Sequence, residues 1–140
     1  MNKWYKDTGE RYKIQGKLSM ERLKSSNDWP KLKAKGASTR HLMQYTFELA
    51  RKHNSGTEHD QARLAPCQLM WSFYEIIAAE GRWMSDDAKG KVEQIGRLFV
   101  AIYSRLSKEA LDAAPPIRAW KMVPKFHVFE HLCALQAVGD

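Results

Sequence analysis

The sequence predicts an all-α protein, a bundle of four to five helices with an irregular basic N-terminal arm. Three observations carry this prediction. Apolar residues recur every three or four positions over most of residues 37–140. No window shows the sustained alternation of apolar and polar residues that marks a strand. Residues 1–36 are polar, basic and interrupted by glycine and proline. We therefore divide the chain into an arm, residues 1–36, and a helical bundle domain, residues 37–140.

The first helix of the bundle is expected between Ser38 and His53. Ser38 or Thr39 is a suitable N-cap, because its hydroxyl can accept a hydrogen bond from a free amide of the first turn. Asn54 and Gly56 are typical of a helix end. The apolar face of this helix holds Leu42, Met43, Thr46, Phe47 and Ala50. Within the arm, residues 18–23 favour at most one short helix.

The next helix begins near Glu58 and meets Pro66. Proline lacks an amide donor and clashes with the preceding turn, so we expect a kink or a fresh start there. From Cys67 to Glu80 the sequence is apolar on every side. A helix of that kind is buried on every side, and we expect it to be the central helix. Gly81 is placed to end it.

Two more helices complete the bundle. Ser85 or Asp86 caps the longest one, which extends to about Ala113. Pro124 stands at a favourable first position of the last helix, which extends to about Val138. The expected core surrounds the 67–80 helix and comprises Trp71, Phe73, Tyr74, Ile77, Phe99, Ile102, Tyr103, Phe129 and Leu132.

The net charge of the chain, +7, comes entirely from residues 1–40, which hold 11 basic and four acidic residues. Residues 41–140 hold 12 of each and are neutral as a whole. Lysines at a helix start suit phosphate groups, and nearby aromatic rings suit unpaired bases. The alternative is a solvated lysine run that a tryptophan anchors to the bundle. The candidate nucleic-acid-binding residues are Arg22, Lys24, Trp29, Lys31, Lys33, Lys35 and Arg40.

A second pattern, His127-Val128-Phe129-Glu130-His131, has the letters of the inverted zinc-protease signature H-x-x-E-H. Residues four apart share a helix face, so both imidazoles can approach one metal ion. A catalytic zinc needs three protein ligands, and only nine residues follow His131, where that signature has its third. An upstream acid such as Glu75 or Glu93 could substitute, but nothing in the sequence requires it. We therefore expect no tightly held metal. His127 and His131 remain candidates, and the alternative is a pair of half-exposed histidines beside the core.

Other chemistry is not indicated. The sequence has no phosphate-binding glycine loop and no nucleophile elbow, so we expect neither a cofactor nor a catalytic site. Cys67 and Cys133 lie in apolar surroundings typical of buried thiols. The N-terminal residues lack an apolar signal segment, and no apolar stretch is long enough to span a membrane. An intracellular protein, nuclear or cytoplasmic, is the expectation.

Two segments, WPKLKAKGASTRHL (residues 29–42) and WKMVPKFHVFEHLC (residues 120–133), together resemble a helical region of dinoflagellate proteins. That region is similar to the part of KDZ-like transposases that carries a P-K-x-H-x-x-x-H-L stretch. Pro124, Lys125, His127, His131 and Leu132 match this stretch. The resemblance covers nearly the whole chain and implies a helical module derived from a mobile-element protein. The catalytic acids of such transposases belong to a core with strands, so none carries over to this chain.

The leading hypothesis is thus a non-enzymatic helical domain whose basic arm contacts nucleic acid, in a transposase-derived protein. The first alternative is a structural or adaptor subunit of a larger assembly, with an acidic protein as the partner of the arm. The second is a metal-dependent hydrolase at His127 and His131.

Overall fold

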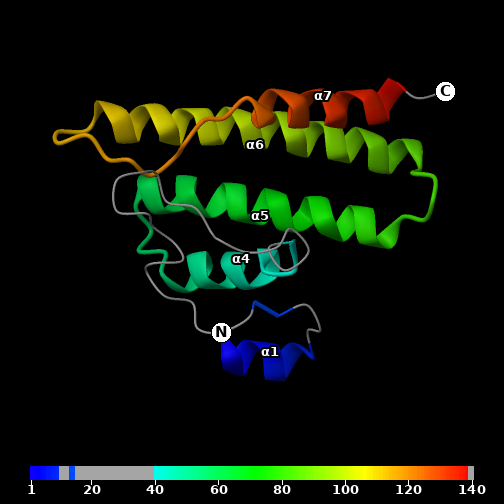
Figure 1. The fold of residues 1–140 in the computed structure, drawn as a ribbon, viewed down its shortest axis with the longest axis horizontal. Coiled ribbons are helices and arrows are strands. Elements are labelled where there is room, and N and C mark those ends of the chain that lie inside the picture. The colour runs from blue at the N-terminus through cyan, green and yellow to red at the C-terminus, as the bar shows by residue number, and fades with distance from the viewer. Residues whose placement is uncertain (10–12, 15–39, 139–140) are drawn as a thin grey trace.

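The structure is a computed structural model and describes residues 1–9, 13–14 and 40–138 (Figure 1). These residues form five helices and contain no strand, which confirms the all-α class. The helices are α1 (Asn2–Thr8), α4 (Met43–Lys52), α5 (Glu58–Ala79), α6 (Asp86–Asp112) and α7 (Lys125–Val138).

Helices α4 to α7 are stacked in the order of the chain, each antiparallel to the one before it (Figure 1). Helix α4 packs on α5, α5 packs on α6, and α6 packs on α7. The connections at residues 53–57 and 80–85 are short, and consecutive helices joined by a few residues become antiparallel neighbours. The connection from α6 to α7, residues 113–124, is longer. Helix α5 is therefore central in position, as its sequence predicted.

Side-chain caps fix where the two long helices begin. The Thr57 hydroxyl accepts a hydrogen bond from the amide of Asp60 at 3.2 Å, at the start of α5. The Ser85 hydroxyl accepts one from the amide of Ala88 at 3.3 Å, which confirms Ser85 as the cap of α6. Both use a hydroxyl to satisfy an amide that lacks a partner in the first turn. The first bundle helix, α4, begins at Met43 with Leu42 at the N-cap position and no side-chain cap, so the predicted start at Ser38 or Thr39 is wrong. Ser38 and Thr39 themselves lie outside the described residues.

The fresh start predicted at Pro66 is wrong. Helix α5 is continuous from Glu58 to Ala79, with Pro66 in its interior. A proline there deprives the Ala62 carbonyl of its intrahelical donor. Pro66 is the one residue of α5 that is buried. Its burial places apolar surface against the rest of the bundle, and this packing offsets the lost hydrogen bond.

The tightest packing lies along α6 and its contact with α7. Leu106 is 0 % exposed, and Val92 and Cys133 are each 2 % exposed. At Gly96, helix α6 lies so close to α7 that a methyl group on this glycine would lie 2.6 Å from the Cys133 Sγ. Small side chains on α6, including Ala88 and Ala110, are buried as well. The close helix approach, rather than bulky interlocking residues, creates this core.

The prediction that the 67–80 helix is buried on every side is wrong for its side chains. Phe73, Ile77 and the other apolar residues of this segment are partly exposed, and Leu132 of the expected core is 53 % exposed. The reason is the arrangement of the helices in a stack. A helix in the middle of a stack is covered on two sides, and its other two sides face outward.

A second, smaller core holds the first residues of the chain against the bundle. Tyr5, Ile14 and Leu42 are buried together, and the amide of Ile14 donates a hydrogen bond to the Tyr5 hydroxyl at 3.0 Å. Tyr5 belongs to α1, so the segment predicted to be largely irregular contains at least this short helix. The predicted short helix at 18–23 lies outside the described residues.

Within the described part of the chain, no helix has the combination of length and apolar character that crossing a membrane requires.

Candidate functional sites

Arg40 is the member of the predicted nucleic-acid-binding set that the structure describes. Its side chain is exposed at the start of the bundle, and its guanidinium carbon lies 5.2 Å from the centroid of the Tyr74 ring. A cation at this distance is attracted by the electron-rich face of the ring. The other candidates, Arg22, Lys24, Trp29, Lys31, Lys33 and Lys35, lie outside the described residues.

Arg40 also lines a hollow of about 150 Å³ between α5 and the start of α4. Two aromatic residues of α5, Trp71 and Tyr74, contribute to its wall. A cation beside aromatic rings is the combination that binds a phosphate and the face of an unpaired base. The remaining lining residues are His41, Met43, Gln44, Glu75 and Ala78.

Sequence reasoning assigned Trp71 and Tyr74 to the core and did not connect them with Arg40. Arg40 precedes Trp71 and Tyr74 by more than thirty positions in the chain, and only the packing of α4 on α5 brings it beside them. The one available signal was their spacing of three, which places both rings on one face of a helix.

Trp4, an aromatic residue of the arm, anchors it to the bundle. Its ring lies 5.4 Å from that of Tyr45 in α4 and 5.4 Å from that of Tyr5, centroid to centroid. Trp4 is partly buried beside the small N-terminal core. Its ring is therefore in contact with two other aromatic rings of the protein.

His127 and His131 share one face of α7, as predicted. Their Nε2 atoms lie 3.0 Å apart, and the ring centroids are 4.2 Å apart. Both side chains are exposed. In the described residues, no group of three or more histidine, cysteine, aspartate or glutamate side chains is placed to hold a metal ion. Two nitrogens fall short of the three protein ligands of a catalytic zinc.

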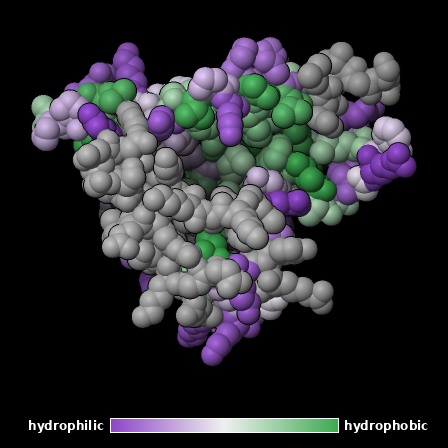
Figure 2. All heavy atoms as spheres, viewed as in Figure 1, coloured by the Kyte–Doolittle hydropathy of each residue, from purple (hydrophilic) through white to green (hydrophobic). Residues whose placement is uncertain are grey.

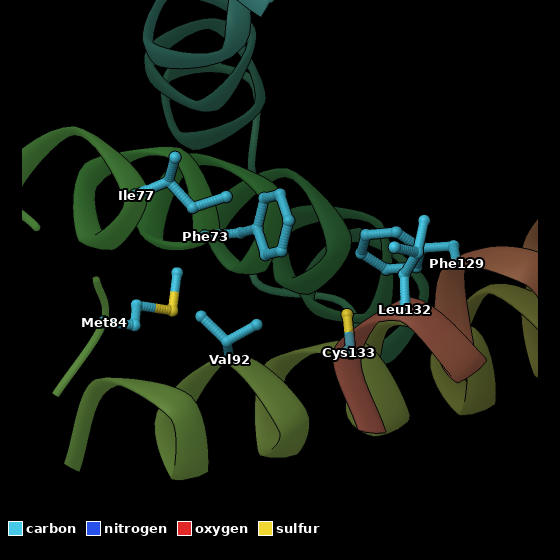
Figure 3. Close-up of a pocket in the computed structure, with 7 residues that line it drawn as sticks. All are labelled: Phe73, Ile77, Met84, Val92, Phe129, Leu132 and Cys133. Atoms are coloured by element: carbon cyan, nitrogen blue, oxygen red, sulfur yellow. The ribbon is translucent and has the colours of Figure 1, made fainter. Parts of the chain in front are cut away.

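An apolar hollow of about 280 Å³ opens between α5, α6 and α7 (Figure 3). Figure 2 shows apolar side chains gathered in the upper part of the view, where these helices lie side by side. A second hollow, of about 250 Å³, shares Phe129 with the first and has Lys125 in its lining. The first hollow is lined by Phe73, Ile77, Met84, Val92, Phe129, Leu132 and Cys133.

The thiol in this hollow is not activated. Burial raises the pKa of the Cys133 thiol, and the negative charge of nearby Glu93 raises it further. Burial also raises the pKa of Cys67, whose Sγ donates a weak hydrogen bond to the Arg63 carbonyl at 3.6 Å. A raised pKa keeps each thiol neutral at pH 7, whereas a nucleophile or a metal ligand is a thiolate.

The fold and these sites define a small all-helical module with a basic N-terminal segment, an exposed histidine pair and an open apolar hollow. No family model, no curated protein and no solved structure matches this chain.

Proposed function

We propose that this chain is a non-enzymatic helical module that contacts nucleic acid through its basic N-terminal residues. The observation that carries the proposal is the distribution of charge. All of the net charge of +7 resides in residues 1–40, while the remaining hundred residues are neutral. A nucleic acid presents a regular array of phosphates, and a concentrated basic segment gains most from such a partner.

The surroundings of Arg40 support the proposal. The basic segment joins the bundle at this residue, beside the hollow that Trp71 and Tyr74 line. A single strand whose phosphate contacts Arg40 would bring a base beside these rings. The resemblance of residues 29–42 and 120–133 to a region related to KDZ-like transposases supports the same class of partner.

A binding titration tests this function. The full chain is titrated into fluorescently labelled single-stranded and double-stranded oligonucleotides, DNA and RNA, at low salt. We expect binding with little sequence preference, because lysines outnumber arginines eight to three in residues 1–40 and lysine binds phosphate as a point charge. Point variants are preferable to deletion of the arm, since Tyr5 and Ile14 are buried against α4.

The variant Arg40→Gln distinguishes the contribution of the hollow to nucleic-acid binding from the contribution of the lysines. The variant removes one cation and its contact with Tyr74, and it leaves the lysines intact. We expect it to weaken binding to single strands more than binding to duplexes, because only unpaired bases can enter the hollow. If the variant weakens binding to single strands and to duplexes equally, Arg40 contacts phosphate and the hollow binds no base.

A structural or adaptor role is the second candidate, and the exposed apolar surface favours it. Trp83, between α5 and α6, is 82 % exposed, and Val128 and Leu132 of α7 are each more than half exposed. Val128 and Leu132 are four positions apart and share a face of α7, and exposed apolar side chains that lie together mark contact sites for other proteins. Failure of the full chain to bind any of the four oligonucleotides at low salt would move this candidate to first place.

A further inference from the structure

The two histidines of α7 form a pair that packing does not require. Phe129 and Cys133 face the other helices, since the Phe129 ring contacts that of Phe73 in α5 and Cys133 contacts Gly96 in α6. His127 and His131 lie on the opposite, exposed side of α7. The rings are nearly perpendicular, at 81°, and each directs its Nε2 toward the other.

The separation of the two nitrogens matches a chelate. A divalent transition metal binds imidazole nitrogen at about 2.0–2.1 Å. Two nitrogens 3.0 Å apart then subtend an angle of about 94° at the ion. That angle is close to the right angle between neighbouring ligands in square-planar or tetragonal coordination. Cu²⁺ and Ni²⁺ prefer this geometry with nitrogen and oxygen ligands, whereas zinc prefers a tetrahedron.

We propose that His127 and His131 form a two-nitrogen chelate for a divalent copper or nickel ion, with water in the remaining positions. In the free protein, one Nε2 donates a hydrogen bond to the other. When the ion binds, the donor ring exchanges its Nε2 proton through water for one on Nδ1, and the rings turn so that both Nε2 lone pairs face the ion instead of each other. In the complex, each ring then carries its proton on Nδ1. This site is separate from the nucleic-acid contact and does not depend on it. With two protein ligands the ion exchanges with solvent, so the site differs from a resident catalytic zinc.

Titration calorimetry of the full chain with Ni²⁺ tests the site. Ni²⁺ is the probe because it does not oxidise the two free thiols, Cys67 and Cys133. We expect one site of highest affinity. His131→Ala removes one of the two nitrogens, and binding should weaken by roughly ten- to a hundredfold, since the second ligand no longer binds intramolecularly. A wild-type protein that binds no more tightly than His131→Ala would overturn the proposal.

A matched control keeps the number of histidines constant. Val128 is 56 % exposed, and the double variant His131→Ala/Val128→His places two histidines next to each other in sequence. Adjacent residues point about 100° apart around a helix and do not face each other. The double variant should therefore bind Ni²⁺ as weakly as His131→Ala, and full affinity in it would contradict a chelate. His53→Ala, at an exposed site outside α7, should leave the affinity unchanged.

Spectroscopy gives a second readout that does not depend on affinity. With one equivalent of Cu²⁺, in a Cys67→Ala/Cys133→Ala background that lacks the oxidisable thiols, the electron paramagnetic resonance spectrum should show coupling to two imidazole nitrogens. The spectrum of His127→Ala should show one. Two coupled nitrogens in both proteins would place the ion elsewhere.

Discussion

Gly96 of α6 and Cys133 of α7 mark the closest approach of these two helices. A Cβ on Gly96 would lie 2.6 Å from the Cys133 Sγ and 2.7 Å from its Cβ. Real side chains do not approach so closely, so a larger residue at position 96 forces the helices apart. The sulfur of a buried cysteine fills the space above a glycine, and this contact holds α7 onto the bundle.

The first prediction follows from that contact. Gly96→Ala should lower the free energy of unfolding by about 1–3 kcal/mol, the usual cost of overpacking. Gly90→Ala, on the same helix, is the matched control. A Cβ there meets nothing within 4 Å, so the variant should gain up to about 1 kcal/mol from the higher helix propensity of alanine. Chemical denaturation measures both, and a stabilising Gly96→Ala would contradict the close approach.

The second prediction compares two leucines of α6. Leu106 is 0 % exposed, whereas Leu98 is 44 % exposed. Leu106→Ala should cost about 2–5 kcal/mol, because it removes buried methyl groups and leaves a cavity. Leu98→Ala removes the same atoms from a largely hydrated position, so it should cost about 1 kcal/mol or less. Equal losses of unfolding free energy in the two variants would show that the core lies elsewhere.

The third prediction concerns alkaline pH. Burial, with help from Glu93, raises the pKa of the Cys133 thiol in the folded protein. In the unfolded chain the thiol ionises near pH 8.5. Below that pH both states are protonated and the contribution of the neutral thiol to stability is complete. It is lost as the pH rises from there through the folded pKa, because the unfolded state then gives up its proton first.

The predicted loss of stability with rising pH is checked by measuring the unfolding midpoint in denaturant between pH 7 and pH 10. The wild-type protein should lose stability more steeply with rising pH than Cys133→Ala. Cys67 and Tyr103 have pKa values raised by burial as well, so a residual slope should remain in the variant. Identical slopes in the two proteins would contradict a buried, neutral Cys133.

Local sequence patterns predicted the helices well. The positions of Ser85 and Pro124 located boundaries that the structure confirms to within a few residues. These signals work because caps and prolines act within one turn of the chain. The fresh helix start predicted at Pro66 was wrong for a related reason. The cost of an interior proline can be read from the local sequence, but its burial against other helices depends on the whole fold.

The candidate sites were predicted in part. The facing of His127 and His131 follows from helix geometry alone, and the structure confirms it. The hollow beside Arg40 could not be predicted, because it requires the packing of α4 on α5. The exposure of α5 was also not predicted. Apolar residues on every side of a helix do not reveal whether the helices form a stack or a closed bundle.

The measurement that tests the central claim most directly is the salt dependence of oligonucleotide binding. A triple variant, Lys31→Gln/Lys33→Gln/Lys35→Gln, is compared with the wild type. The control, Lys52→Gln/Lys91→Gln/Lys108→Gln, lowers the net charge equally but changes exposed lysines of the neutral body. Thermal unfolding of both variants confirms folding, and only small changes are expected for the control, whose three lysines are exposed.

Each phosphate contact contributes a slope of roughly 0.7–0.9 in the logarithm of affinity against the logarithm of salt concentration. The account predicts that wild-type binding weakens steeply with salt, and that the first variant loses both affinity and slope. It also predicts that the control keeps the wild-type slope. If the first variant binds DNA and RNA as the wild type does, the lysine cluster is not the site and the central claim is contradicted.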